Sequence, residues 1–316
     1  MAYYIANTDY HWFTFLKSIN PEDVNFWQPG GNMRFHAIPG GAPFLFRLKN
    51  PWNKIAGLGF FSSQSLIPVD FAWEVFQERN GAKTFEQFYN QIDTYRRPEN
   101  KLNAYPTIGC IVLTNPIFFD EADWILTPSD WAKNIVQGKT YSLESETGSQ
   151  IWSQIQLLLE KYQLAEYQSG ENDLSVLIDS ESPRYGKEFL YKPRLGQGAF
   201  RILVTDSYSR RCAISGEKTL PVLEAAHIKP YEKSGPHQVS NGLLLRSDIH
   251  KLFDKGYLTI TSDYHIEVSS RIKEQYENGR DYYKFHGNEL ITMPSLMNQK
   301  PGKEFIDWHN CNIYKG

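Results

Sequence analysis

Residues 223–254 have the sequence LEAAHIKPYEKSGPHQVSNGLLLRSDIHKLFD, and this stretch decides the fold of the C-terminal part of the chain. Its apolar start predicts a strand over residues 220–228. The segment that follows is rich in Pro, Gly and Ser, which favours a loop, and residues 242–246 predict a second short strand. Ser247 can then cap a helix in which apolar residues recur at helical spacing. The predicted order is strand, loop, strand, helix.

Three polar side chains occupy distinct places in this pattern. His227 lies near the end of the first predicted strand, Asn241 precedes the second strand, and His250 falls in the helix nine residues after Asn241. With their flanks EAAHI, NGLLLR and DIHKLFD, these positions resemble the three signature positions of the HNH (ββα-metal) nuclease family. The resemblance implies a β-hairpin and a helix that hold one divalent metal.

Phosphodiester hydrolysis needs a base to deprotonate water, a cation to neutralise the developing charge, and a group that fixes the ring of the base. The resemblance implies that His227 is the general base, which suits an imidazole whose ordinary pKa lies near neutrality. It implies that His250 is a metal ligand and that Asn241 orients the His227 ring, through its side-chain amide or the adjacent backbone. The expected cofactor is a divalent metal, first Mg²⁺, with Mn²⁺ or Ni²⁺ as alternatives.

One position departs from the family pattern. Many members carry an Asp or His directly before the base as a second metal ligand, whereas this chain has Ala226. Glu224 lies two residues earlier on the same face of the predicted strand and can supply an oxygen ligand. Asp248 is the other candidate ligand. Water and the scissile phosphate can also complete the coordination of Mg²⁺, which keeps several waters in proteins.

The charge around this motif favours a polyanionic partner. Residues 184–255 hold 13 Lys and Arg against 7 Asp and Glu, although the whole chain has a net charge of −3. Phosphate contacts require such a local basic surface. His237, in the predicted loop, is assigned a phosphate-contacting or solvated role. We expect four residues to contact DNA phosphates: Arg210, Arg211, Lys229 and Lys233.

Cysteine usage predicts neither a structural zinc nor a disulfide framework. Cys212 is followed three residues later by Ser215, and Cys110 and Cys311 are isolated, so zinc-ribbon spacing is missing. Three scattered cysteines suit a reducing cytoplasm. The first residues lack a basic lead and an apolar core, and no run approaches the roughly 18 apolar residues of a membrane helix. We therefore expect a cytoplasmic protein without membrane association.

The first 135 residues differ in character, because they are dense in aromatic side chains. Alternating and apolar runs predict four strands and one amphipathic helix. This pattern predicts a mixed, mainly antiparallel β-barrel with helices, so the fold class of the chain is α+β. The predicted strands are residues 2–6, 43–49, 55–61 and 107–114, and the predicted helix is 84–96.

The same region resembles the PUA-like superfamily, especially its EVE and SRA-like branches. The resemblance lies in four sequence segments and their order: YYIAN, FWQPG, PFLFRLK and KIAGLGFF. In that superfamily the pocket often receives a flipped, modified base, which needs aromatic walls and a polar group at the base edge. The expected pocket residues are Trp12, Trp27, Phe60 and Trp73 for the walls, with Asn7 or Asp9 at the base edge.

Between these regions, residues 149–162 show apolar positions at helical spacing and predict a connecting helix. Its apolar stripe can pack on either domain or pair with a second copy of the chain. The predicted organisation is a reader domain over residues 1–135, a helical connector over 136–183 and a nuclease domain over 184–316. A homodimer is expected because one HNH site cuts one strand, so that a double-strand break needs two sites.

Together these observations predict a modification-dependent restriction endonuclease that acts on double-stranded DNA carrying modified cytosine, such as 5-methylcytosine or 5-hydroxymethylcytosine. One alternative is an HNH nuclease whose N-terminal domain binds unmodified DNA, RNA or a protein. The other is a nucleic-acid reader with a lapsed nuclease site, for which Ala226 is the motivating observation.

Overall fold

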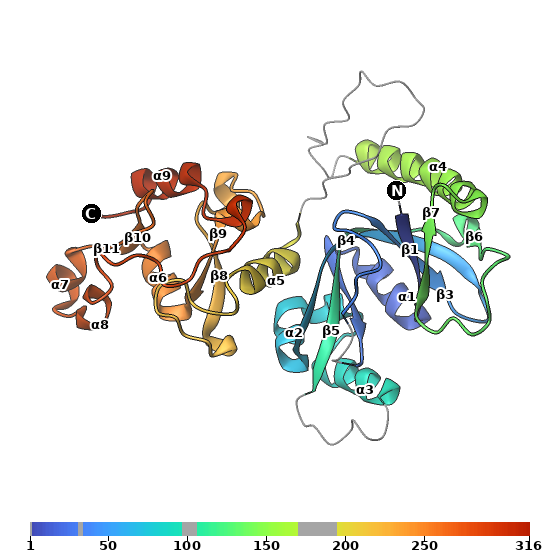
Figure 1. Cartoon of the computed structure of the whole chain (residues 1–316), viewed down its shortest axis with the longest axis horizontal. Helices are drawn as coiled ribbons and strands as arrows, with labels where there is room; N and C mark the ends of the chain where they lie inside the picture. Colours follow the sequence, from blue (N-terminus) through green and yellow to red (C-terminus); the bar gives the residue numbers. More distant parts are fainter. Residues whose placement is uncertain (1, 31–33, 97–105, 170–194) are drawn as a thin grey trace. The chain divides into compact units, whose positions relative to one another are not determined.

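The computed structural model describes residues 2–30, 34–96, 106–169 and 195–316, with the backbone alone for residues 163–169. The chain divides into two compact units (Figure 1). Unit 1 comprises Met1–Leu66 with Phe76–Arg194, and unit 2 comprises Ile67–Val75 with Leu195–Gly316. None of the described helices combines the length and apolarity that a membrane span requires.

Unit 1 is built on a mixed sheet with helices on its faces (Figure 1). Its elements are β1 (Ala2–Thr8), α1 (Tyr10–Ile19), β2 (Asp23–Gln28), β3 (Pro43–Leu48), β4 (Lys54–Pro68), α3 (Phe85–Tyr95), β5 (Thr107–Phe118), β6 (Ile125–Leu126), β7 (Gly138–Ser142) and α4 (Glu146–Ser169). The helix α2 (Val69–Phe76) follows β4 directly. All four strands and the helix predicted in this region form, and β4 and β5 extend beyond the predicted bounds.

The sheet is open, so the predicted barrel is wrong. Its strand order is β2-β5-β4-β3-β1-β7, with β6 beside β4, and only β1 and β3 pair in parallel among the described strand pairs. The reason is that both faces are apolar. Tyr4 and Phe46 belong to a core on the α1 side, whereas Tyr3 and Leu45 belong to a second core on the other face. Because each face is covered by its own helix, the sheet does not need to curl around a single interior.

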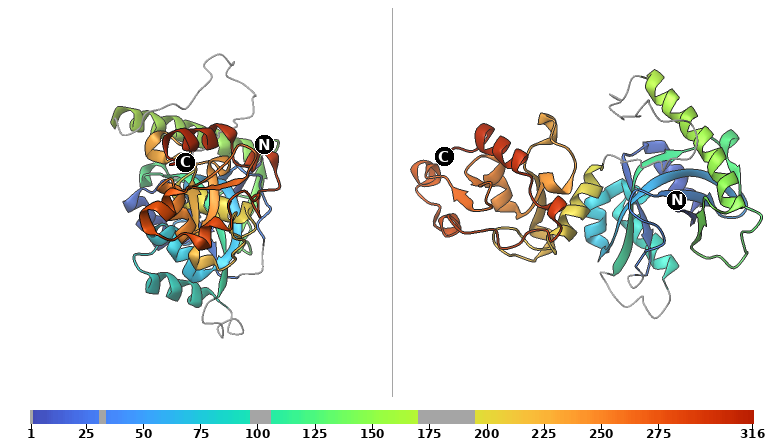
Figure 2. Two further views of the ribbon diagram at one scale, coloured as in Figure 1. Left: turned by 90° about the vertical axis from the view of Figure 1, so that its left-hand side faces the viewer. Right: turned by 45° about the horizontal axis from the view of Figure 1, so that its top comes forward.

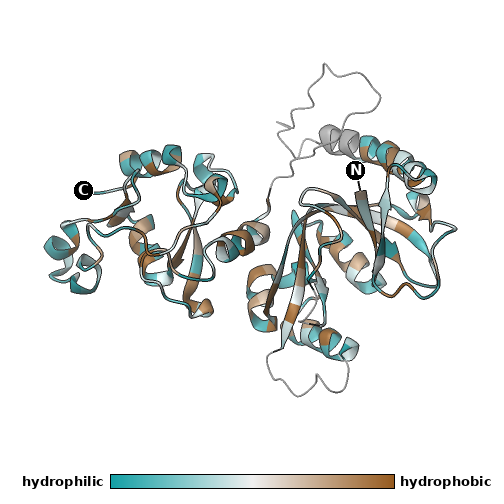
Figure 3. Ribbon diagram, viewed as in Figure 1, coloured by the Kyte–Doolittle hydropathy of each residue, from teal (hydrophilic) through white to brown (hydrophobic). Residues whose placement is uncertain are grey.

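The helix α4 provides the cover for the second face. Ile151, Trp152 and Ile155 are buried in the core that also contains Tyr3 and Leu45. Figure 2 shows α4 along the sheet, and Figure 3 shows hydrophilic and hydrophobic residues mixed along this helix. The apolar stripe of the predicted connecting helix therefore packs on the N-terminal sheet. Part of the predicted connector, residues 170–183, lies outside the described residues.

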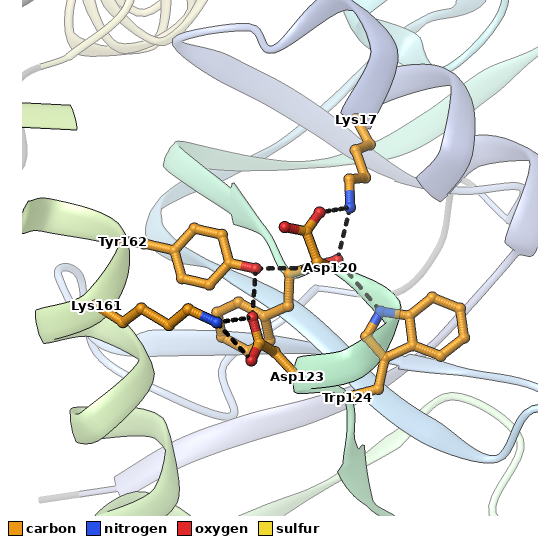
Figure 4. Close-up of polar contacts among 7 residues, drawn as sticks. Lys17, Asp120, Asp123, Trp124, Lys161 and Tyr162 are labelled. Atoms are coloured by element: carbon orange, nitrogen blue, oxygen red, sulfur yellow. Dashed lines mark hydrogen bonds and ion pairs between the residues drawn. The ribbon is translucent and has the colours of Figure 1, made fainter. Parts of the chain in front are cut away.

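A polar cluster fixes α4 to the segment that follows β5 (Figure 4). Lys161 Nζ lies 2.7 Å from an Asp123 carboxylate oxygen, and the Tyr162 hydroxyl donates to the same carboxylate over 3.0 Å. The Asp120 backbone N–H donates to the Tyr162 hydroxyl, and Lys17 on α1 donates to the Asp120 carboxylate. These contacts link both helices to the segment that follows β5.

Unit 2 contains the predicted hairpin and helix. Its elements from residue 195 onward are α5 (Gln197–Ser207), β8 (Leu223–His227), β9 (Gly242–Arg246), α6 (Ser247–Asp254), β10 (Leu258–Ile260), β11 (Ile266–Val268), α7 (Arg271–Tyr276), α8 (Arg280–Tyr283) and α9 (Lys303–Asn312). Strands β8 and β9 pair antiparallel, and β10 and β11 form a second hairpin. One core, which includes Phe200, Leu243, Ile249 and Phe253, joins α5, β9 and α6.

Candidate functional site

The site begins with His227 at the end of β8. Its backbone pairs with Gly242 in the hairpin register. A Cβ atom at Gly242 would lie 2.5 Å from Val204 Cγ2 on α5, so glycine allows α5 to approach the hairpin closely. This approach places the Phe200 ring of α5 flat against the His227 ring, with centroids 3.9 Å apart and an interplanar angle of 11°. The His227 imidazole is thereby held on one face by a buried aromatic ring.

His227 also contacts a second histidine. Its Nε2 atom lies 2.9 Å from Nδ1 of His237, which comes from the loop between β8 and β9. Burial first, and then the nearby rings of His237 and His250, lower the pKa of His227 to about 4, while Asp254 opposes the shift. The His227 ring is therefore neutral at neutral pH and can accept a proton.

Asn241 holds the loop rather than the ring of His227. Its Oδ1 atom accepts from the Lys229 N–H over 2.9 Å, and its Nδ2 group donates to the carbonyls of Lys229 and Pro236 over 2.9 and 3.0 Å. The side chain is completely buried, and its backbone carbonyl accepts from the N–H of Ile228. The polar atoms of the Asn241 side chain all bind backbone groups of the loop between β8 and β9, at residues 229 and 236. This clamp replaces the expected side-chain contact to the His227 ring.

His250 lies between two carboxylates. Its Nδ1 atom is 2.6 Å from Oε2 of Glu224 on β8, and its Nε2 atom is 3.3 Å from Oδ2 of Asp254, one helical turn later on α6. Burial by itself lowers the pKa of His250, but the Asp254 and Glu224 carboxylates outweigh burial and raise it. The carboxylates of Glu224 and Asp254 therefore favour a positive charge at His250.

This cluster offers two side chains, His250 and Glu224, that can serve as ligands of one divalent metal. Two ligands at about 2.1 Å from one metal and at right angles to each other lie about 3.0 Å apart. The Nδ1 atom of His250 and the Oε2 atom of Glu224 are slightly closer than that, so a small side-chain movement would open a ligand pair. Among the described residues, no group of three or more His, Cys, Asp or Glu side chains is already arranged to hold a metal.

Asp248, the other predicted ligand, is committed to different partners. Its two carboxylate oxygens lie 2.6 and 2.8 Å from Nε and Nη2 of Arg246, and the Tyr282 hydroxyl donates to Oδ2 over 3.1 Å. The hydrogen bonds from Arg246, and to a smaller extent its positive charge, lower the pKa of the Asp248 carboxyl. Asp248 thus stabilises the start of α6, and the structure does not place it with His250.

The four predicted phosphate contacts differ in how freely they face solvent. Arg211 and Lys233 are exposed, and Lys233 ends a short 3-10 turn in the β8–β9 loop. Lys229 lies over the Trp308 ring at 5.7 Å, and Arg210 pairs with Asp206 over 3.3 Å. Exposed loop cations bind a polyanion with little rearrangement.

The predicted base pocket does not assemble as expected in unit 1. Trp12 is 4% exposed and packs in the core on the α1 side, whereas Phe60 is 5% exposed and belongs to the core on the opposite face. Trp27 is half-buried, and its Nε1 donates to the Asn80 carbonyl. Trp73 falls within unit 2. The many aromatic residues of this region therefore pack in its cores. The same residue types would line a base pocket, so the sequence alone does not separate the two roles.

The two predicted edge groups are likewise bound to the protein itself. The Asn7 amide donates to the backbone of Ile135 and Val136, and its oxygen accepts from Arg47. Asp9 caps α1 by accepting from two backbone N–H groups of its first turn and also accepts from the Tyr95 hydroxyl. Both side chains satisfy structural hydrogen bonds.

A different cavity is present in unit 1. It measures about 470 Å³ and is lined by Phe35, His36, Ala37, Ile38, Pro39, Phe61 and Gln64. A Cβ on Gly109 would lie 3.1 Å from Oε1 of Gln28 and 3.6 Å from Nε2 of Gln64, so both amides lie over this glycine. The buried Oε1 atom of Gln28 has no hydrogen-bond partner among the described residues. The lining of the cavity combines the aromatic rings of Phe35 and Phe61 with the amide of Gln64.

Sequence reasoning missed the partners of the two histidines. Asp254 stands four residues after His250, so helical periodicity alone places both on one face of α6. For His237 the sequence predicts only phosphate contact or solvent exposure, because a loop residue gives no periodic signal of its neighbours. Phe200 is remote in sequence, and only the packing of α5 brings it to His227.

Comparison with known proteins agrees with the nuclease motif. The HNH_2 family model, described as HNH endonuclease, matches residues 212–261. A search of curated proteins finds no match. The crystal structure of ASCH from Zymomonas mobilis is similar with a TM-score of 0.32 and 13% identity, covering 48% of this chain and 94% of that chain.

A second solved structure, the modification dependent TagI restriction endonuclease, is similar with a TM-score of 0.27 and 13% identity. It covers 92% of this chain, and 75% of the TagI chain is covered. HNH nucleases generally use a divalent metal and act on DNA. The hairpin β8–β9 and helix α6, with their His227, Asn241 and His250, lie inside the matched family segment. The chain therefore carries an HNH endonuclease domain, a phosphodiester hydrolase, in its C-terminal part.

Proposed function

We propose that this protein is a metal-dependent DNA endonuclease in which His227 is the general base. The observation that carries the proposal is the state of the His227 ring: it is neutral, stacked on Phe200 and bound through Nε2 to His237. Its Nδ1 atom has no hydrogen-bond partner among the described residues, so this nitrogen can face a substrate water. A neutral imidazole with one open nitrogen is what proton abstraction requires.

In the proposed reaction, Nδ1 of His227 takes a proton from a water molecule as the water oxygen forms a bond with phosphorus. A P–O ester bond breaks and its oxygen leaves with the electron pair. Asn241 keeps the loop in place, so that His237 continues to hold the His227 ring during proton transfer. Arg211 and Lys233 are proposed to bind flanking phosphates.

His250 and Glu224 are proposed to hold the divalent metal, through Nδ1 and Oε2. Asp254 then accepts the N–H of the opposite ring nitrogen of His250 and orients the ring, as carboxylates do for many metal-bound histidines. The bound metal supplies positive charge to the phosphate as negative charge develops. Mg²⁺ is the proposed metal because the Glu224 carboxylate and retained water suit it. Mn²⁺ and Ni²⁺ are the alternatives, and the imidazole of His250 suits Ni²⁺.

We further propose that unit 1 recognises modified cytosine in double-stranded DNA. The support is the PUA-like pattern of the sequence together with the cavity beside Phe35 and Phe61. Its volume of about 470 Å³ lies within the range of roughly 300–1,000 Å³ typical of small-molecule sites. Aromatic side chains can stack on a flipped base, and the amide of Gln64 in the cavity lining can bind its polar edge. Two copies of the chain would cut the two strands.

Cleavage of matched DNAs tests both parts of this proposal. The substrates contain cytosine, 5-methylcytosine, 5-hydroxymethylcytosine or glucosylated hydroxymethylcytosine, each with Mg²⁺, Mn²⁺ or Ni²⁺. We expect cleavage of one or more modified substrates and little cleavage of the unmodified one. Equal cleavage of all four would retain the nuclease and remove the modified-base reader. Binding without cleavage under every metal would indicate a reader with a lapsed site, as Ala226 suggests.

A further inference from the structure

We infer that His237 is a positioning residue that selects the tautomer of His227 in which Nε2 carries the proton and Nδ1 is the proton acceptor. This inference rests on the proposed nuclease function, because it concerns how the general base is prepared. The juxtaposition that carries it is the 2.9 Å contact between Nε2 of His227 and Nδ1 of His237.

The hydrogen-bond roles follow from the two nitrogens of each ring. A neutral imidazole has one N–H donor and one acceptor nitrogen, so between two neutral rings one donates and the other accepts. If Nδ1 of His227 is to take a proton from water, Nε2 must carry the hydrogen and donate to Nδ1 of His237. His237 then carries its own ring proton on Nε2. In the opposite arrangement Nδ1 of His227 would be protonated, and the ring could not act as a base from that side.

The surroundings of His237 hold it in this position. Its ring stacks on Tyr231, with centroids 4.4 Å apart and an interplanar angle of 19°, and it also packs against Phe200 at 5.6 Å. The loop that carries it is closed by the three side-chain hydrogen bonds of Asn241 to backbone groups at residues 229 and 236. His237 follows Pro236 directly, so the clamp sets the backbone next to it.

The same contact becomes stronger during the reaction. When His227 accepts a proton at Nδ1 it becomes an imidazolium, and its Nε2–H group then donates to a neutral acceptor as a charge-assisted hydrogen bond. Such bonds are about twice as strong as neutral ones. While the His237 ring is neutral, this hydrogen bond opposes the effects that lower the pKa of His227, which are burial and the charges of neighbouring histidines. The bond then stabilises the imidazolium that follows proton transfer more than the neutral ring before it, and that difference raises kcat rather than substrate affinity.

Two substitutions separate the hydrogen bond from the ring stacking. His237→Asn keeps an acceptor oxygen one bond from Cγ, where Nδ1 stands, but removes the ring. His237→Phe keeps the ring between Tyr231 and Phe200 but removes the acceptor. The matched control is His265→Phe, since His265 is a half-buried histidine of the same unit outside the site. Each protein is assayed for kcat, KM and DNA binding with Mg²⁺.

We expect His237→Phe to lower kcat on the order of a hundredfold, a value within the range that general-base catalysis contributes, with KM and DNA binding nearly unchanged. His237→Asn should retain activity within several-fold of the natural protein, and His265→Phe should match it. The reverse order, with Phe active and Asn inactive, would show that stacking alone matters and would overturn the inference. Full activity of both variants would overturn it as well.

A tautomer measurement decides the question independently of cleavage. In ¹⁵N-histidine-labelled protein, the ring nitrogen shifts of His227, assigned by their loss in His227→Ala, report which nitrogen is protonated. The Nε2–H tautomer should dominate in the natural protein and in His237→Asn, and a mixture should appear in His237→Phe. If the natural protein binds DNA but does not cut it, the proposed function fails while this spectrum still tests His237. An unchanged tautomer in His237→Phe would overturn the inference.

Discussion

The clamp made by Asn241 allows a quantitative prediction. In Asn241→Ala, three hydrogen bonds to backbone groups at residues 229 and 236 are lost, and the side chain that made them is completely buried. Each buried group left without a partner costs about 1–3 kcal/mol, and water reaching the loop reduces this, so we expect a total loss of about 3–5 kcal/mol. Such a loss is a large part of the roughly 5–15 kcal/mol that stabilises a domain.

Asn241→Asp makes a sharper comparison. One carboxylate oxygen can still accept the N–H of Lys229, but the other would face two carbonyl oxygens where the amide group donated. We expect it to destabilise unit 2 at neutral pH at least as much as Asn241→Ala. The matched control is Asn288→Ala, because Asn288 is exposed and its side chain donates only to the Lys284 carbonyl. A surface change of this kind costs within about 0.5 kcal/mol.

Hydrogen exchange at increasing urea concentration measures the loss of stability in the hairpin and α6 themselves. Peptides from residues 223–254 report the opening free energy of the hairpin and α6 without interference from unit 1. The prediction is a fall of about 3–5 kcal/mol for Asn241→Ala and almost none for Asn288→Ala. If Asn241→Ala lost no more than the control, the clamp would not hold the loop and the reasoning would be refuted.

Three further predictions concern pH, packing and metal affinity. Burial lowers the pKa of His309, which is 2% exposed, to about 4. Because His309 titrates near 6.5 when unfolded, unit 2 should lose up to roughly 3 kcal/mol as pH falls from about 6.5 towards 4. Urea unfolding of His309→Gln at each pH should show a smaller loss; an equal loss would contradict the assignment. Gly242→Ala should separate Phe200 from His227, cost about 1–3 kcal/mol and reduce cleavage more than DNA binding; undiminished cleavage would argue against the role of the stacked ring. Glu224→Gln should raise the Mg²⁺ concentration for half-maximal cleavage on the order of tenfold to a hundredfold, and an unchanged metal titration would remove Glu224 as a ligand.

The hairpin and helix of unit 2 could be predicted because their signals are local. Residues 242–246 form β9 as expected. Ser247 is the first residue of the helix rather than its cap, because Arg246 occupies the N-cap position. The strand prediction was too long at its start, since Leu220–Val222 is a 3-10 turn containing a proline. Local patterns also identified the mixed α+β class. They did not reveal whether the N-terminal sheet closes, because that depends on which helices cover its two faces.

The contacts of the candidate site were harder to predict. Glu224 was placed near the expected metal ligand by strand alternation, and the structure brings it to 2.6 Å from His250. The prediction of the base pocket relied on the number of aromatic residues. Trp12 shows why this is weak, since it is buried in a core that also needs aromatic side chains. The contact between His227 and His237 depends on the loop conformation, which sequence spacing does not determine.

Nicking of supercoiled plasmid DNA carrying modified cytosine tests the central claim most directly. The natural protein, with Mg²⁺ and with EDTA, is compared with His227→Ala, and DNA binding is measured in parallel. The account predicts metal-dependent nicking that EDTA abolishes and that His227→Ala lacks, while the variant still binds DNA. Nicking by His227→Ala at the rate of the natural protein, or no nicking by the natural protein with any of Mg²⁺, Mn²⁺ or Ni²⁺, would contradict it.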